Sequence, residues 1–172
     1  ELPIQYADYA VWQRRHLAGE ALDAQLRYWK GRLGGEFPPL NLPTDRPRPM
    51  SQSFRGATSF LPLPATLMME IRALCQRRRD TLYMLLLTAF TSLLRRYTRL
   101  DDIIIGSPIA NRTRVETEGL IGFFVNTLAL RTDLSGDPSF SELLQRARAV
   151  ALEAYGRQDI PFELLVERLK PE

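Results

Sequence analysis

The sequence predicts an α/β fold in which helices cover a sheet. Three observations support this class. Several stretches repeat apolar residues at helical spacing, and residues 103–105 form a continuous isoleucine run, which is typical of a strand covered on both faces. The 172 residues are 45% hydrophobic and 25% charged, enough to bury a core. The length fits one domain, or one lobe of something larger.

The N-terminal part is predicted to be helical and then extended. A helix is expected over residues 6–17, with aromatic side chains at Tyr9 and Trp12. A second helix is indicated by apolar residues spaced four, three and four apart, namely Leu22, Leu26, Trp29 and Leu33. It should end at the glycine pair 34–35. The boundaries expected are a helical entry over 1–34, a proline-rich connector over 35–55 and an α/β core over 56–172.

The core should alternate strands and helices. A short strand is expected over 57–63, a helix from Pro64 to about residue 79, and then a helix capped by Asp80 or Thr81. That helix has almost no polar side before Arg95, which predicts a central position. A polar loop over 106–119 separates the isoleucine strand from a long strand over 122–132. Helices follow from about residue 138 to 155 and after Pro161.

Charge and composition exclude several classes of function. The net charge is +3, with 23 basic residues interspersed among 20 acids, so we expect no nucleic-acid partner. The arginine clusters at 77–79 and 95–99 fall at helix C-termini, where cations are favourable, although an arginine-lined site for an acidic or phosphate-bearing partner stays open. No apolar run approaches the roughly 18 residues of a membrane span and no leader is evident, so neither membrane insertion nor export is expected.

The scarcity of cysteine and histidine narrows the possible chemistry. Cys75 is the single cysteine and lies on an apolar helical face, so we expect an inert buried thiol and a reducing, cytoplasmic setting. His16 is the single histidine, which leaves no metal cluster and few mechanisms based on a nucleophile and a histidine. Neither a metal site nor a catalytic residue is therefore predicted. The absence of a starting methionine suggests that the chain continues in a longer polypeptide.

Four segments, in this order and at this spacing, resemble the condensation domain of nonribosomal peptide synthetases. They are Tyr6-Ala-Asp-Tyr-Ala-Val-Trp-Gln13, Gly106-Ser-Pro-Ile-Ala-Asn-Arg112, Ile121-Gly-Phe-Phe-Val-Asn-Thr-Leu-Ala-Leu-Arg131 and Arg157-Gln-Asp-Ile-Pro-Phe-Glu163. The connector around Asp45 and Arg46 is similar as well, so the resemblance spans the whole chain. The family usually has histidine where this chain has Arg157.

The resemblance implies the second lobe of a two-lobed, chloramphenicol-acetyltransferase-like enzyme. Such an enzyme joins a carrier-bound acyl or peptidyl thioester to a carrier-bound aminoacyl amine. The implied partners are the missing N-terminal lobe, peptidyl carrier proteins with their phosphopantetheine arms, and an adjacent adenylation domain. The family's catalytic His-His-x-x-x-Asp-Gly motif lies upstream of the Tyr6 motif, and His16 followed by Leu17 does not match it. The segment 122–127 resembles peptide-bond-forming members more than epimerising or heterocyclising relatives.

The resemblance also assigns expected roles to residues. Asn126, Phe124 and Thr127 are expected to line the tunnel, and Ser107, Asn111 and Arg112 are expected in a loop that faces the other lobe. A structural role is expected for the remaining motif residues: Tyr6, Asp8, Tyr9, Trp12, Asp45, Arg46, Gln158, Asp159, Pro161, Phe162 and Glu163. Asp45 and Arg46 are expected to hold the connector by an ion pair.

Asn126 has two interpretations. Alternation along the strand places Phe124, Asn126 and Leu128 on one side, so a carboxamide lies among apolar residues and needs partners. The residues alone favour hydrogen bonds from the Asn126 carboxamide to neighbouring backbone groups. The resemblance instead favours hydrogen bonds to the amide groups of a substrate's phosphopantetheine arm. At the level of the whole chain, the alternatives to half of a condensation domain are a non-catalytic lobe that docks carrier proteins, and half of a standalone acyltransferase of the same superfamily.

Overall fold

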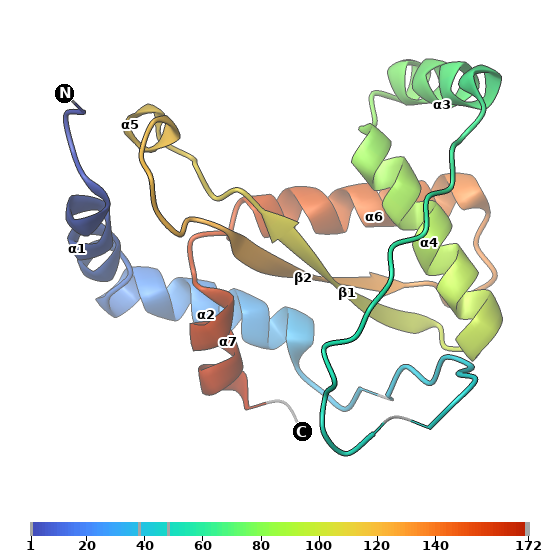
Figure 1. Ribbon diagram of the computed structural model, residues 1–172, viewed down its shortest axis with the longest axis horizontal. Coiled ribbons are helices and arrows are strands. Elements are labelled where there is room, and N and C mark those ends of the chain that lie inside the picture. The colour runs from blue at the N-terminus through green and yellow to red at the C-terminus, as the bar shows by residue number, and fades with distance from the viewer. Residues whose placement is uncertain (1, 38, 48, 171–172) are drawn as a thin grey trace.

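The computed structural model describes residues 2–37, 39–47 and 49–170 (Figure 1). Two strands, β1 (Asp102–Ile109) and β2 (Asn126–Asp133), pair antiparallel, with Ile105 opposite Leu130. The helices in chain order are α1 (Tyr6–His16), α2 (Gly19–Leu33), α3 (Ala65–Arg78), α4 (Leu82–Thr98), α5 (Val115–Glu118), α6 (Phe140–Tyr155) and α7 (Phe162–Leu169).

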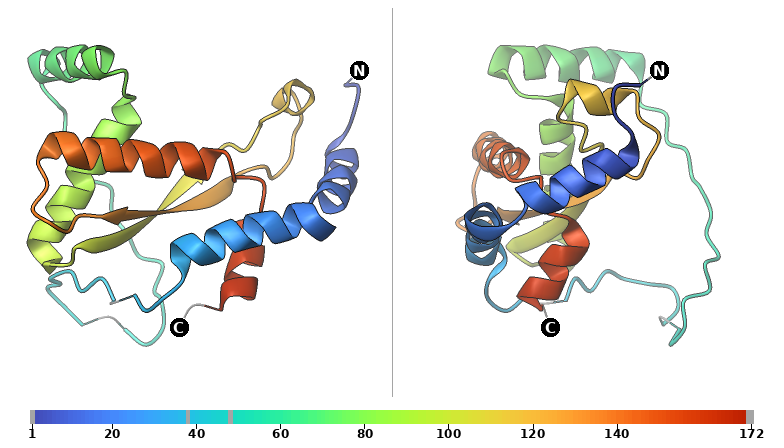
Figure 2. Two further views of the ribbon diagram at one scale, coloured as in Figure 1. Left: turned by 180° about the vertical axis from the view of Figure 1, so that it is seen from behind. Right: turned by 90° about the vertical axis from the view of Figure 1, so that its left-hand side faces the viewer.

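The sheet lies between helices. The left panel of Figure 2 shows α4 and α6 on one side of the strands, and α2 and α7 on the other. Every second residue of β2 from Asn126 to Thr132 is buried, as the predicted alternation requires. The prediction of a sheet covered by helices is therefore confirmed.

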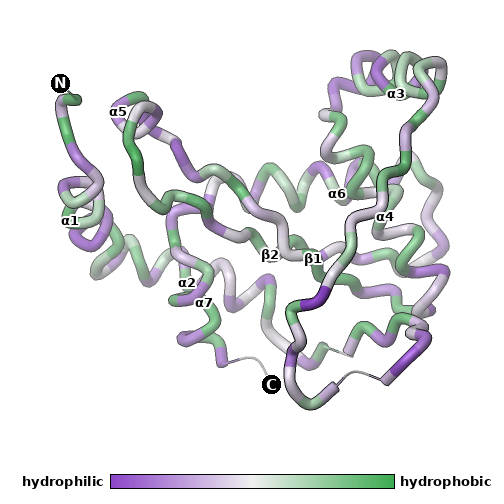
Figure 3. Tube along the Cα trace, in the orientation of Figure 1, coloured by the Kyte–Doolittle hydropathy of each residue, from purple (hydrophilic) through white to green (hydrophobic). Residues whose placement is uncertain are grey.

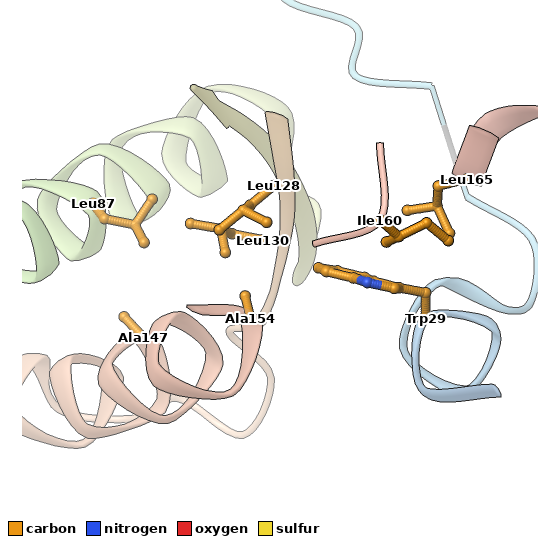
Figure 4. Packing of buried hydrophobic residues seen from close by; sticks show 8 residues of the cluster. All are labelled: Trp29, Leu87, Leu128, Leu130, Ala147, Ala154, Ile160 and Leu165. Carbon is orange, nitrogen blue, oxygen red and sulfur yellow. The ribbon is translucent and has the colours of Figure 1, made fainter. Parts of the chain in front are cut away.

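The main core cluster has members on both sides of the sheet. Figure 4 shows Leu128 and Leu130 of β2 between Leu87, Ala147 and Ala154 on one side and the Trp29 ring on the other. Trp29 is 2% exposed and also contacts Ile160 and Leu165 in this cluster. Trp29 thus links α2 to the sheet and to the last helix.

Local sequence signals set the helix ends. The Thr81 hydroxyl accepts a hydrogen bond from the Met84 N–H at the start of α4. At the start of α6, Ser139 and Glu142 form a reciprocal capping box. The helices α3 and α4 end at Arg79 and Arg99, both of which adopt left-handed backbone conformations. These caps explain why the predicted helices lie within about two residues of the observed bounds.

Three expectations about the elements are wrong. Residues 57–63 are extended but form no strand, because no described residue offers them a backbone ladder. Regular pairing of the long strand begins only at Asn126, since residues 122–125 have no partner in β1. The predicted polar loop over 106–119 begins later than expected, because β1 runs to Ile109, and the loop contains the short α5.

The helix α4 is central on one side only. Its buried residues are Met84, Leu85, Leu87, Thr88, Thr91 and Leu94. The opposite side carries exposed apolar residues, including Phe90 at 50% exposure. Among the described residues, the predicted central position therefore holds for one side of α4 only. Of the described residues, none belongs to a helix long and apolar enough to cross a membrane.

Candidate functional site

Asn126 is the hydrogen-bonding centre of the site. Its Nδ2 donates to the carbonyls of Gln158 and Ile160, both at 2.8 Å. Its Oδ1 accepts from the N–H groups of Thr127 at 2.9 Å and Phe162 at 3.0 Å. These four bonds use both donors and both lone pairs of the carboxamide, which is 7% exposed as a residue. The carboxamide therefore has no group left for a substrate amide, and the structure supports the backbone interpretation of Asn126.

Two side chains of α2 hold the same turn. The Trp29 Nε1–H donates to the Arg157 carbonyl at 3.2 Å. The Gln25 carboxamide accepts from the Ile160 N–H at 3.2 Å and donates to the Asp159 carboxylate at 3.3 Å. Residues 157–162, held by Asn126, Gln25 and Trp29, are called the clamped turn below. Gln25 is not among the residues predicted from the sequence, and its only signal there is its position within the apolar stripe of α2.

An aromatic cluster covers the start of β2. The Phe124 ring is buried, with the Tyr9 ring at 4.8 Å and the Tyr6 ring edge-on at 5.2 Å. The Arg112 guanidinium lies 4.1 Å from the centre of the Phe124 ring. It also donates to the Leu120 carbonyl at 2.9 Å and to the Thr117 carbonyl. Arg112 therefore fixes the shape of the loop after β1.

Gly122 allows α1 to approach this cluster. A Cβ at position 122 would lie 2.2 Å from Cδ2 of Tyr6. The Tyr6 ring has little freedom to move, because its hydroxyl donates to the Phe123 carbonyl at 2.9 Å.

We expect Gly122→Ala to detach the Tyr6 ring and lower the free energy of unfolding of the complete domain by about 2 kcal/mol, as overpacking does. Chemical denaturation measures this loss. Gly136→Ala is no control, since Gly136 has a positive φ. Gly31→Ala is suitable, because its added Cβ meets no atom within 4 Å. Equal effects of Gly122→Ala and Gly31→Ala would contradict the close approach.

A polar cavity adjoins the aromatic cluster. It has a volume of about 380 Å³, and its lining includes Trp12, His16, Arg114, Gln158 and Asp159. The His16 ring stacks on Trp12 at 4.8 Å, and the Arg114 guanidinium lies 4.3 Å from the Trp12 ring. Burial raises the pKa of the nearby Tyr9 hydroxyl, and the negative charge of Asp159 raises it further.

The remaining predicted residues lie in several places. Ser107 is buried inside β1, so the prediction that it belongs to a loop is wrong. Asn111 follows β1 with φ of 51°, and Thr127 is half-buried in β2. Asp8 accepts from the Gln5 N–H at the start of α1. Pro161, Phe162 and Glu163 start α7.

The connector residues Asp45 and Arg46 are both exposed and make no ion pair with any described residue, contrary to expectation. The connector instead lies beside the sheet through Phe37, whose ring is 4.6 Å from the Arg131 guanidinium. Arg131 in turn pairs with Asp102 at 2.6 Å. The contact between Phe37 and Arg131 thus holds the connector in place of the predicted ion pair between Asp45 and Arg46.

The side chains of this site mainly hold backbone groups in place, and few of them are of a kind that reacts with a substrate. Among the described residues no group of three or more histidine, cysteine, aspartate or glutamate side chains is placed to hold a metal ion. Cys75 is buried in α3, as predicted. All four motifs meet here. The first contributes the rings of α1, the segment 121–127 contributes Phe124 and Asn126, and the clamped turn is bonded to Asn126. Arg112 of the second motif lies against the Phe124 ring.

Comparisons with known proteins match this arrangement over the whole chain. Residues 1–172 match the family model described as Condensation domain. One linear gramicidin synthase protein of Brevibacillus parabrevis is 56% identical over 172 residues, which cover 100% of this chain and 2% of that protein. Malpinin synthetase of Mortierella alpina is 48% identical over 170 residues, covering 99% of this chain and 2% of that protein. The chain therefore spans a small part of the curated relatives it matches.

Solved structures agree with the fold. The X-domain in its complex with OxyB, from teicoplanin biosynthesis, superposes with a TM-score of 0.91 at 33% identity, over 99% of this chain and 39% of that chain. The condensation domain from the monacolin K polyketide synthase MokA gives a TM-score of 0.86 at 29% identity, over 100% of this chain and 41% of that chain. These matches confirm the chloramphenicol-acetyltransferase-like α/β architecture that the resemblance implied.

Proposed function

The chain belongs to the condensation-domain family of nonribosomal peptide synthetases, and on this premise we propose that it forms the C-terminal lobe of a domain that makes an amide bond between two carrier-bound substrates. The donor is an acyl or peptidyl thioester, and the acceptor is the amine of an aminoacyl thioester. Phosphopantetheine arms of peptidyl carrier proteins present both substrates, and an adenylation domain of the same assembly line supplies the amino acid.

The observation that carries this proposal is the meeting of the four motifs at one end of β2. Asn126 and Gln25 fix the clamped turn, and Arg112 fixes the loop after β1. Exposed apolar side chains surround this end of the sheet: Val115, Ile121, Phe123 and Val125. An apolar patch of this kind favours a second surface against it. We assign that surface to the N-terminal lobe, with the substrate tunnel between the two lobes.

The side chains of this lobe orient the substrates and exclude water, and proton transfer is carried out by the other lobe. The His-His-x-x-x-Asp-Gly motif implied by the family is absent from the sequence. His16 stacks on Trp12 beside Arg114, outside any pairing with a nucleophile among the described residues. The amine that attacks the thioester must lose a proton, which requires a base from the other lobe.

We expect the 172-residue chain to form no dipeptide from loaded donor and acceptor carriers, whereas the complete domain forms it. Mass spectrometry of the carrier-bound products measures the reaction. As control, the complete domain with its upstream motif histidines replaced by alanine should be as inactive as the short chain. Dipeptide formed by the short chain would refute the assignment of proton transfer to the other lobe.

A second candidate function is docking without catalysis. The similarity to the X-domain, which was solved in a complex with OxyB, favours this alternative. The two functions differ in the complete domain: a catalytic domain yields dipeptide, and a docking domain binds its partner but yields none. A standalone acyltransferase would instead accept substrates free of carrier protein.

A further inference from the structure

The loop after β1, residues 110–125, extends beyond the end of the sheet (Figure 1 and the left panel of Figure 2). Its only regular element is α5, and none of its residues pairs with a strand in the described part of the chain. Figure 3 shows polar colours along the arm from β1 to α5 and apolar colours along the arm from α5 to β2. A loop of this length without strand pairing is usually either mobile or functional. Its shape depends on side chains that bond one arm to the other.

Arg112 is the side chain that ties the two arms together. It lies on the polar arm, and its guanidinium donates to the carbonyls of Thr117 and Glu118 in α5 and of Leu120 in the apolar arm. The bond to Leu120 measures 2.9 Å, and the bond to Glu118 measures 3.4 Å. Thr117 and Leu120 are both buried, so water replaces a hydrogen bond lost there only poorly.

The same guanidinium also attaches the loop to the rest of the chain. It lies 4.1 Å from the centre of the Phe124 ring, which is 3% exposed and packs on Tyr6 and Tyr9 of α1. A planar guanidinium can stack on a ring and donate in several directions within its plane at the same time, whereas the ammonium group of lysine cannot. Arg112 therefore holds both arms and the aromatic cluster through one group.

The segments that Arg112 holds carry apolar side chains with little to contact in this chain. Ile121, Phe123 and Val125 of the apolar arm are 93%, 73% and 54% exposed, and Val115 of α5 is 79% exposed. Fixing these side chains adds little to the core, because they bury almost no surface here. The positions that Arg112 fixes instead serve the surface that we assign to contact with the N-terminal lobe.

We infer that Arg112 is a positioning residue for amide-bond formation, which holds the apolar arm of the loop where the two lobes enclose the reacting groups. This role rests on the proposed function. The thioester and the attacking amine must lie about 3–3.5 Å apart, and a displacement of about 1 Å can cost about 100-fold in rate. Arg112 acts through the loop and touches no reacting atom, so its loss should affect the alignment of bound substrates more than their binding.

Chemical rescue of the complete domain tests this role. Arg112→Ala should lower kcat for dipeptide formation, per folded molecule, at least about tenfold, and should change the KM for the loaded acceptor carrier less than about threefold. Guanidinium chloride at about 50 mM, far below the molar concentrations that unfold proteins, should restore part of the lost rate by occupying the vacated site. Mass spectrometry of the carrier-bound product measures turnover, and circular dichroism gives the folded fraction.

Arg114→Ala is the matched control. Arg114 lies in the same arm and its guanidinium is 4.3 Å from the Trp12 ring, but its side chain donates to no carbonyl among the described residues. Its loss should change kcat less than about threefold, with no response to guanidinium. Arg112→Lys is a second variant in case the alanine variant fails to fold. It keeps the charge but not the bridging bonds, so its turnover should be as slow as that of Arg112→Ala.

Three results would count against this role of Arg112. Normal turnover per folded molecule in both Arg112 variants, beside an active unsubstituted domain, would overturn it and leave the proposed function intact. A loss of activity that follows the folded fraction alone, with no response to guanidinium, would assign Arg112 to stability and overturn it as well. An unsubstituted complete domain that forms no dipeptide would refute the proposed function and, with it, the positioning role.

Discussion

Replacing Asn126 by alanine should lower the free energy of unfolding of the complete condensation domain by about 3 kcal/mol, because it removes four hydrogen bonds from a buried site. The carbonyls of Gln158 and Ile160 and the N–H of Phe162 lose their side-chain partner together. The clamped turn should therefore loosen. Urea denaturation of the purified variant measures the loss, and hydrogen exchange at residues 158–162 locates it.

The matched control is Gln158→Ala. Its backbone carbonyl accepts from Asn126, whereas its side chain makes no hydrogen bond to a described residue, so the substitution keeps the contact and should cost less than about 0.5 kcal/mol. Asn126→Asp should resemble Asn126→Ala, because a carboxylate oxygen would face the two carbonyls that now receive N–H donors. A stable Asn126→Ala variant with slowed condensation would instead show that the carboxamide acts on the substrate.

Replacing Trp29 by alanine should destabilise the complete domain by about 3–5 kcal/mol, the usual range for removing a large buried aromatic side chain. The ring lies between β2 and the last helix, in one core cluster with Leu128, Ile160 and Leu165. Thermal or urea unfolding, monitored by circular dichroism, measures the change.

Two variants separate the contributions of this residue. Trp29→Phe keeps most of the apolar contact and loses the bond to the Arg157 carbonyl, so it should cost about 1–2 kcal/mol. The neighbouring Tyr28→Ala serves as control, since Tyr28 is only partly buried. A loss for Trp29→Ala no larger than that for Tyr28→Ala would contradict the central position of the indole ring.

The sequence allowed most helices and the layered class to be predicted, because periodicity and capping act locally. The Thr81 cap and the stripe of α2 are examples. The expected strand at 57–63 failed for the opposite reason: a strand exists only with a neighbour, and its pattern says nothing about whether that neighbour is present. The two-sided apolar pattern of α4 likewise predicted burial that these residues alone do not provide.

The sequence predicted which residues form the site better than it predicted what each residue does there. The four motifs named residues that do meet around Phe124 and Asn126. The alternation of side chains along β2 predicted that Asn126 is buried. Because buried polar groups are nearly always hydrogen-bonded, it also predicted that the carboxamide has hydrogen-bond partners. The choice between backbone and substrate depended on Gln158, Ile160 and Phe162, more than 30 positions away, and no local pattern reports such a contact. Gln25 was missed for the same reason.

The clamped turn is recognised almost wholly through its main chain. Asn126, Trp29 and Gln25 contact carbonyls or N–H groups of residues 157, 158, 160 and 162, and the one side chain they bond is Asp159. The identities of Arg157 and Gln158 are thus decoupled from the geometry of the turn. Arginine can therefore stand at position 157 without disturbing the turn, and protein engineers can vary Gln158, which lines the adjoining polar cavity, to alter that cavity while the scaffold keeps its shape.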